Sequence, residues 1–193
     1  MSDGFTLDSN VKGGLMKGLG RMFSGESLFM ATYTASRPDS TIAFASTVPG
    51  KILAIDTAKT SLICQKGAFL CAQPTVEINT VLTKKFTAGF FGGEGFILQQ
   101  IQGSGMAFLE VDGDVVDRVL APGEVIKVDT GNVFAFEPSI SYEIETVKGV
   151  KNILFGGEGL FLTKLTGPGK VYMQTMNIAE FTGRIAQGLP ASK

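Results

Sequence analysis

Three glutamates stand in one short repeated phrase and are the residues of this chain whose spacing best suits a shared chemistry. Glu26, Glu94 and Glu158 each follow a glycine, in Phe-Ser-Gly-Glu-Ser once and in Phe-Gly-Gly-Glu-Gly twice. If the three copies converge on an axis, the carboxylates could share a hard cation such as Ca²⁺, which takes oxygen ligands. Alternatively, each glutamate lies in a tight turn, accepts hydrogen bonds from backbone N–H groups and points away from the other two. The flanking glycines favour this second interpretation.

The sequence contains few residues that could form a nucleophilic active site or a zinc site. The chain has no histidine, so a Ser-His or Cys-His nucleophile pair is impossible. Its two cysteines, Cys64 and Cys71, are too few for a zinc site. They flank a predicted hairpin turn at residues 66–68, where they could be cross-strand neighbours, and reduced core thiols are favoured over a disulfide because nothing suggests export. We therefore predict no catalytic residues, no cofactor and a non-enzymatic protein.

The densest acidic stretch is formed by Glu110, Asp112, Asp114 and Asp117. A helix-loop-helix calcium loop needs ligands at alternate positions, a central glycine and a closing glutamate, and this stretch lacks that series. Asp112 with Gly113 predicts a type I′ turn between two strands. The acidic stretch is thus predicted to be a solvated hairpin tip.

The repeated phrase also predicts how the chain is organised. The spacing is 68 residues from Gly25 to Gly93 (93 − 25) and 64 from Gly93 to Gly157 (157 − 93). A Gly-x-Gly turn ending at Gly105 follows the second phrase, and one ending at Gly169 follows the third. A copied unit of this length predicts equivalent turns about an approximate threefold axis. Gly93 and Gly157 are predicted either to have positive φ or to lie too close to other backbone for a Cβ. The predicted copies cover approximately residues 15–80, 84–146 and 148–185.

The elements expected to position these residues are β-strands. Residues 96–101, 125–128 and 141–145 are short, rich in β-branched or aromatic side chains and bounded by Gly, Pro or Asp-Gly. Short helices are possible only near residues 15–17 and in the tail near residues 178–181. With 193 residues, 44% of them hydrophobic, the chain can bury one core, which predicts a single domain over residues 1–193.

Charge and hydropathy bear on partners and location. A net charge of −1 gives no field to attract nucleic acid, and none is predicted as a partner. Neither a signal-peptide-type stretch nor an apolar run of about 18–20 residues is present, so no transmembrane segment is predicted. The expected location is cytoplasmic, with peripheral membrane association left open.

Several segments resemble a known family. They are Gly-Glu-Gly-Phe-Ile-Leu at 93–98, Leu-Ala-Pro-Gly-Glu at 120–124, Val-Asp-Thr-Gly at 128–131 and, above all, the stretch 155–169. From about Ser24 to Arg184 the chain is similar to the family named after a yeast mitochondrial-biogenesis protein, altered inheritance of mitochondria. The resemblance implies an all-β fold similar to that of the tryptophan-RNA-binding attenuation protein, built from three related sheet units. Bacterial members are mostly uncharacterised, and the mitochondrial member is implicated in inner-membrane organisation.

Two functional hypotheses follow. In the first, the protein is a non-catalytic interaction or scaffold module that binds copies of itself and an unidentified partner protein, with a link to membrane organisation implied by the resemblance alone. In the second, it binds a small ligand or a cation near the pseudo-threefold axis. Basic residues fall at different positions in each copy, so no RNA-binding residues carry over from the similar fold. An exposed apolar surface would favour the first hypothesis, and a pocket with convergent polar groups the second.

Overall fold

The computed structural model describes residues 1–10, 30–81, 97–146 and 161–189 of the chain. The chain divides into two compact units, one of Met1–Ala45 with Leu82–Ile97 and one of Ser46–Val81 with Leu98–Lys193. The prediction of an all-β fold is confirmed, since the regular secondary structure of the described residues consists of β-strands, one short 3₁₀-helix and one α-helix. The single-domain organisation over 1–193 stays a prediction.

The described strands of the first unit form one antiparallel pair. β1 (Phe5–Asn10) lies against β2 (Met30–Ala35), with Leu7 opposite Tyr33. The ring of Tyr33 meets that of Phe44 edge-on at a centroid distance of 5.6 Å. This aromatic contact links β2 to the segment that follows it.

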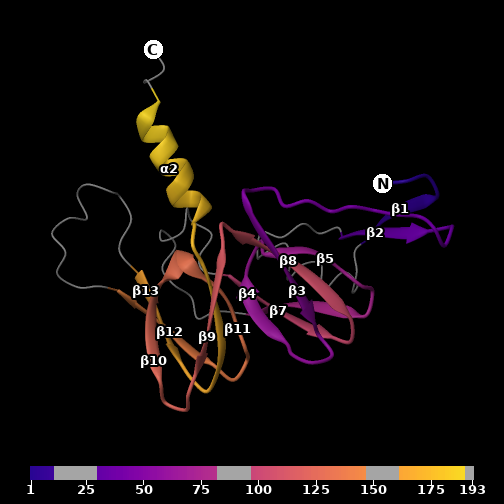
Figure 1. The fold of residues 1–193 in the computed structure, drawn as a ribbon. Helices are drawn as coiled ribbons and strands as arrows, with labels where there is room; N and C mark the ends of the chain where they lie inside the picture. The colour runs from indigo at the N-terminus through magenta and orange to yellow at the C-terminus, as the bar shows by residue number, and fades with distance from the viewer. Residues whose placement is uncertain (11–29, 82–96, 147–160, 190–193) are drawn as a thin grey trace. The chain divides into compact units, whose positions relative to one another are not determined.

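The second unit carries most of the strands (Figure 1). They include the predicted segments 96–101, 125–128 and 141–145 to within two residues. Their bounds are β3 (Gly50–Asp56), β4 (Leu62–Gln65), β5 (Phe69–Ala72), β6 (Val76–Val81), β7 (Leu98–Gly103), β8 (Met106–Asp112), β9 (Val115–Leu120), β10 (Val125–Asp129), β11 (Val133–Phe136), β12 (Ser141–Thr146), β13 (Phe161–Thr166) and β14 (Gly169–Gln174). A 3₁₀-helix, η1 (Thr130–Asn132), joins β10 to β11.

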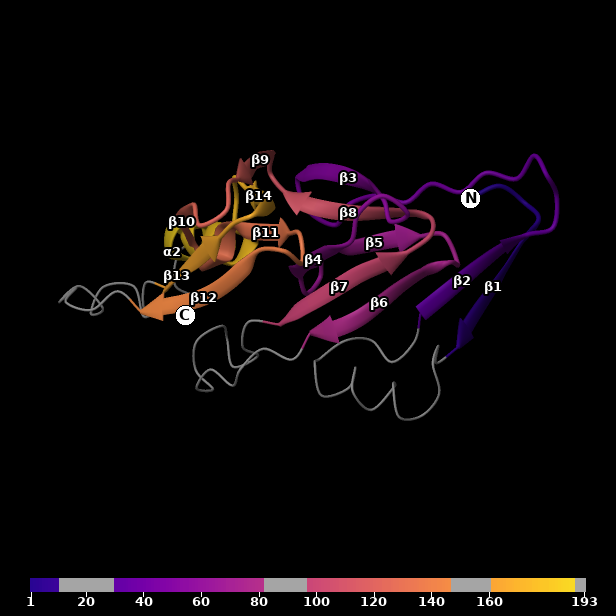
Figure 2. The ribbon, with the colours of Figure 1, turned by 90° about the horizontal axis from the view of Figure 1, so that it is seen from below.

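The second unit contains the same arrangement of six strands twice. In the first repeat, β3 to β8, the strand orders are β3-β8-β5 and β6-β7-β4. In the second repeat, β9 to β14, they are β9-β14-β11 and β12-β13-β10. Each strand of the first repeat therefore has an equivalent in the second, from β3 and β9 to β8 and β14. Figure 2 shows β3, β8 and β5 side by side, with β6, β7 and β4 as the neighbouring layer.

The pairing registers of the two repeats agree as well. Leu62 lies opposite Ile101 in the first repeat, and the residues 64 positions later, Ile126 and Leu165, lie opposite each other in the second. Both β5 and β11 have a bulge, between Phe69 and Cys71 and 64 positions later between Val133 and Ala135. β9 alone is shifted, by one residue against β14. Bulges at equivalent positions are features of a specified fold, so a duplicated unit with a 64-residue period is established here. The threefold axis and the predicted boundaries stay predictions.

The core of the first repeat lies between its two sheets. The sequence of β8, Met-Ala-Phe-Leu-Glu-Val-Asp, alternates in burial, so that Ala107, Leu109 and Val111 are fully covered. Leu62 and Ile101 of the facing sheet are equally buried in the same cluster. Two residues of β11 in the second repeat, Phe134 and Ala135, complete this cluster. The two repeats thus share part of one core.

The C-terminal helix was predicted near residues 178–181 and is confirmed as α2 (Ile178–Gly188) (Figure 1). Asn177 caps it, because its side-chain oxygen accepts hydrogen bonds from the N–H groups of Ala179 and Glu180. None of the residues of α2 is buried, and Phe181 and Ile185 are about half exposed. Among the described residues, no helix has the length and apolar character needed to cross a membrane.

Two predicted hairpins are wrong. β8 pairs with β3 and β5, whereas β9 pairs with β14, so Asp112 and Gly113 connect two different sheets. Gly113 has φ +73°, but Asp112 does not have the positive φ that a type I′ turn also requires at its first central position. Likewise β4 pairs with β7 and β11 while β5 pairs with β8, so Cys64 and Cys71 are not cross-strand neighbours. In both places the strand before the turn and the strand after it belong to different sheets.

Candidate functional site

The residues of the repeated phrase lie outside the described part of the chain. Glu26, Glu94 and Glu158, with Gly25, Gly93 and Gly157, fall in the ranges 11–29, 82–96 and 147–160. These ranges connect β1 to β2, β6 to β7 and β12 to β13, and each of those strand pairs is antiparallel. The cation site and the positive φ at these glycines stay predictions.

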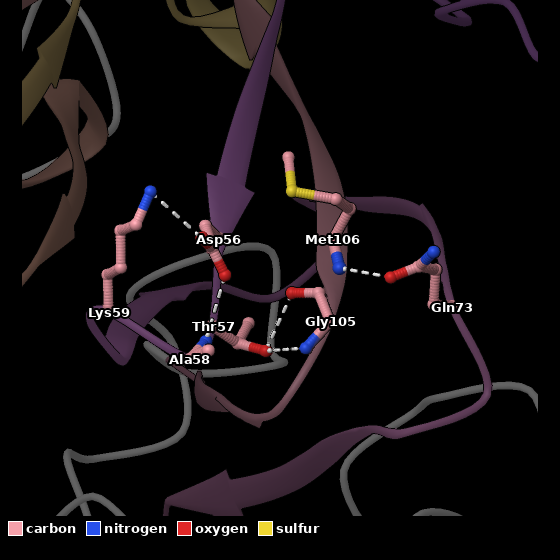
Figure 3. Close-up of polar contacts among 7 residues, drawn as sticks. All are labelled: Asp56, Thr57, Ala58, Lys59, Gln73, Gly105 and Met106. Carbon is pink, nitrogen blue, oxygen red and sulfur yellow. Dashed lines mark hydrogen bonds and ion pairs between the residues drawn. The ribbon is translucent and has the colours of Figure 1, made fainter.

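The structure places Gly105 in a tight connection between β7 and β8 (Figure 3). Its carbonyl oxygen accepts a hydrogen bond from the hydroxyl of Thr57 at 2.8 Å, and its N–H donates to the same hydroxyl oxygen at 3.0 Å. The next N–H, that of Met106, donates to Oε1 of Gln73 at 2.8 Å. A Cβ on Gly105 would lie 2.6 Å from Oγ1 of Thr75, so there is no room for a side chain.

Gly169, the equivalent of Gly105, opens β14. It has φ +143°, and a Cβ there would lie 2.4 Å from Oγ of Ser139. In the first repeat the positive φ instead falls at Gly103, with φ +126°. Glycine is therefore needed at Gly105 because a Cβ has no space, and at Gly169 also because φ is positive. Both glycines have a structural role in their turns.

The acidic stretch does not form one patch. Oε2 of Glu110 accepts hydrogen bonds from the hydroxyl of Ser46 and the N–H of Thr47, each at 2.9 Å. Oδ2 of Asp112 accepts a hydrogen bond from the N–H of Ile178 at 3.1 Å, at the start of α2. These two carboxylates hold neighbouring segments in place and are not part of a solvated hairpin tip.

The other two acidic residues form exposed ion pairs. Asp114 lies 2.7 Å from Nζ of Lys51, and a hydrogen bond from that lysine, aided by one from a backbone N–H, lowers the pKa of the Asp114 carboxyl. Asp117 lies 2.8 Å from Nζ of Lys170, and its hydrogen bond raises the pKa of that lysine. In the described part of the chain, no three His, Cys, Asp or Glu side chains group closely enough to hold a metal ion.

A cleft of ≈ 210 Å³ lies where the two repeats meet. Phe134 of β11 forms part of its wall, with Glu110, Asp112 and Gln174 beside it. Gln174 is already engaged, because its Nε2 donates to the carbonyl of Gly131 at 2.9 Å. The remaining lining residues are Thr47, Val48, Gln65, Lys66, Gly67, Ala68 and Ile178. The cleft is smaller than the roughly 300–1,000 Å³ of typical small-molecule sites.

The junction beside this cleft joins the two repeats through one short strand pair. β4 of the first repeat lies antiparallel to β11 of the second, with Cys64 opposite Ala135 and Ile63 opposite Phe136. Both Cys64 and Ala135 are 0% exposed. Across the same junction, Nε2 of Gln65 donates to the carbonyl oxygen of Thr130 at 3.2 Å. The junction is head-to-tail, because β4 and β11 are not equivalent strands of the repeat.

The equivalents of the junction strands are edge strands. Among the described strands, β5 pairs only with β8 and β10 only with β13. Cys71 of β5 and Val128 of β10 are half-buried, and burial raises the pKa of the Cys71 thiol. The edges of β5 and β10 were not predicted from the sequence. The signal that could have found them is that Gly-Ala-Phe-Leu-Cys at 67–71 is followed 64 positions later by the similar Gly-Asn-Val-Phe-Ala at 131–135.

Comparisons with known proteins bear on the family and the fold of the chain. Residues 1–176 match the family described as mitochondrial biogenesis AIM24. An uncharacterized protein of Streptococcus pyogenes serotype M6 is 28% identical over 181 residues, which are 93% of this chain and 72% of that protein. A crystal structure of a Streptococcus pyogenes protein from a structural genomics consortium has a TM-score of 0.69 and 23% identity, and covers 97% of this chain and 84% of its own. That similarity shows the fold.

Proposed function

The chain belongs to the mitochondrial biogenesis AIM24 family, and we propose that it is a non-catalytic interaction module that assembles with copies of itself through the edges of its sheets. One observation carries the proposal. The fold joins two equivalent repeats head-to-tail through β4 and β11, and the equivalents of these strands, β10 and β5, are sheet edges in the described part of the chain. A head-to-tail junction used once can be used again between molecules.

The character of β5 supports the proposal. Its sequence, Phe-Leu-Cys-Ala, contains no charged side chain. Edge strands are often protected by lysines, prolines or short length, because an unprotected edge recruits other strands. β5 is short, at four residues, but it has neither a lysine nor a proline. With a net charge of −1, long-range repulsion does little to keep two copies apart. An uncharged edge on a nearly neutral protein is best covered by another strand.

The alternative, a small-ligand or cation site, has weaker support. The cleft at the junction is small, and the oxygens of Glu110, Asp112 and Gln174 that border it accept hydrogen bonds from the chain itself. Such groups hold the fold and are not left to converge on a ligand.

The test is the mass of the full chain in solution. Multi-angle light scattering behind size exclusion, at several micromolar concentrations, should give a mass above the 20.4 kDa of one chain, and the mass should fall on dilution. A mass that stays at one chain at every concentration contradicts the proposal. A carboxylate-dependent turnover found in a substrate screen would contradict its non-catalytic part.

A further inference from the structure

The two repeats predict which edges associate. By the 64-residue offset, β4 is equivalent to β10 and β5 to β11. Inside the chain, β4 pairs with β11, which is the second-repeat equivalent of β5. We call β4 and β10 the β4-type strands, and β5 and β11 the β5-type strands, so the junction pairs one strand of each type. Each molecule has one further strand of each type, β10 and β5, and both are edges among the described strands.

The other edges of the second unit lack such a precedent. Among the described strands, β3, β6, β9 and β12 also end their sheets. β3 is equivalent to β9 and β6 to β12, so none of these four has an equivalent that is paired across the junction. Among the described edge strands, β5 and β10 are therefore the two whose equivalents pair with each other inside the chain.

Burial differs between the repeats at the same strands. Cys64 of β4 is 0% exposed, whereas its equivalent Val128 is half-buried. Ala135 of β11 is 0% exposed, whereas its equivalent Cys71 is half-buried. Away from the junction the two repeats are only partly alike. Ala107 and its equivalent Val171 are each 0% exposed, whereas Leu109 is 0% exposed and its equivalent Met173 is half-buried. Half-buried apolar side chains at the equivalent positions are what a junction that needs a second molecule would leave.

Resting on the proposed self-association, we infer that β10 of one molecule pairs antiparallel with β5 of a second copy, in the register of the internal junction. Adding 64 to Cys64 gives Val128, and subtracting 64 from Ala135 gives Cys71. Cys71 of one copy therefore lies opposite Val128 of the other. The neighbouring pair, Ile63 with Phe136, becomes Lys127 with Ala72.

One contact of the internal junction is not reproduced between copies. The donor Gln65 becomes Asp129, and the acceptor carbonyl of Thr130 becomes that of Lys66. A carboxylate cannot donate a hydrogen bond to a carbonyl oxygen, so the contact between copies lacks this bond. The association is thus weaker than the internal junction and reversible, which makes trapping by a covalent link the suitable assay.

The test uses the native thiol of Cys71 and the variant Val128→Cys in the full chain. Directly opposed residues of an antiparallel pair have Cα atoms about 4.5–5.5 Å apart, within reach of a disulfide. Mild oxidation at alkaline pH, chosen because burial raises the pKa of the Cys71 thiol, should give linked chains on a non-reducing gel. Mass spectrometry of the product should identify Cys71 joined to the introduced cysteine.

Two controls make the result specific. Adding Cys71→Ala to Val128→Cys should abolish the linked species. Ser141→Cys places an exposed thiol on β12, the other edge of the sheet that contains β10, and should not link to Cys71. Equal linkage from Ser141→Cys, or a product that joins only two introduced cysteines, overturns the inference.

A measurement on the unaltered chain covers the case in which Val128→Cys does not fold. Hydrogen exchange at residues 69–72 and 125–129 should slow as the protein concentration rises, while exchange at 141–146 stays constant. Concentration-dependent protection confined to other strands overturns the inference but leaves the proposed self-association standing. A chain that is monomeric by light scattering removes both.

Discussion

Phe134 should be the residue that couples the stability of the two repeats. It belongs to β11 of the second repeat, is 1% exposed and packs in the core cluster of the first repeat. Its equivalent, Leu70 of β5, occupies the corresponding bulge and is only half-buried. The same position thus carries a buried anchor in one repeat and a partly exposed side chain in the other.

The expected cost follows from this difference in burial. Phe134→Ala removes a fully covered ring and should lower the free energy of unfolding by about 3–5 kcal/mol. Leu70→Ala removes a partly exposed side chain and should cost about 1–2 kcal/mol, below the range for fully buried leucines. With a urea dependence of about 2 kcal/mol per molar, the first change moves the unfolding midpoint by roughly 2 M and the second by about 0.5–1 M.

Urea unfolding followed by circular dichroism measures both midpoints. Loss of Phe134 should also broaden or split the transition, because the repeats then share less of one core. The Leu70→Ala variant, the matched control, should keep a single transition. Equal midpoint shifts for the two substitutions would refute the reasoning, since they would show that Phe134 is no more deeply anchored than its equivalent.

Three further outcomes are expected. Gly169→Ala should lower the free energy of unfolding by about 1–3 kcal/mol in denaturant melts, because φ is +143° and Oγ of Ser139 lies in the way, whereas Gly183→Ala in α2 meets nothing within 4 Å and should leave the midpoint unchanged or raise it. The carboxyls of Asp114 and Glu124 have pKa values lowered by hydrogen bonds, so their contribution to stability is present above the unfolded values near 3.8 and 4.5 and is lost as pH falls through the folded ones. Thermal melts between pH 6 and pH 2 should therefore show a steeper loss for the unaltered chain than for Glu124→Gln, and parallel curves would contradict this. Burial raises the pKa of the Cys71 thiol, so its alkylation by iodoacetamide at pH 8 should be slower than in the urea-unfolded chain, and equal rates measured by peptide mass spectrometry would contradict it.

The period of the fold was readable from the sequence, but the pairing of its strands was not. The 64-residue interval predicted a repeated unit, and the short alternating segments predicted strands that the structure contains at 98–103, 125–129 and 141–146. Asp112 with Gly113 is a strong local signal for a turn, and the chain does turn there. The two strands then enter different sheets, since turn residues determine local dihedral angles while burial of both apolar faces determines the partners.

For the candidate site, too, the repeat was predictable from the sequence and the pairing of strands was not. The equivalence of residues 67–71 and 131–135 was visible in the sequence. It does not reveal that β4 contacts β11 while, among the described strands, β10 and β5 end their sheets. Equivalent strands thus have different neighbours in the two repeats. A sequence period shows which strands are equivalent, but it does not show which strands lie next to one another. The three glutamates of the repeated phrase were the most conspicuous chemical signal, and they lie outside the described residues.

The closure of each repeat by its first and last strands has a consequence for how the chain is made. β3 pairs with β8, and Gly50 lies opposite Asp112, 62 positions later (112 − 50). β9 pairs with β14 in the same manner, with Val115 opposite Gln174, 59 positions later (174 − 115). During synthesis neither of these strand pairs can form until nearly the whole repeat has left the ribosome. Such distant contacts make folding slow, and the β4 edge must wait longer still for β11. The nascent chain therefore emerges with an open apolar edge that a chaperone would be expected to shield.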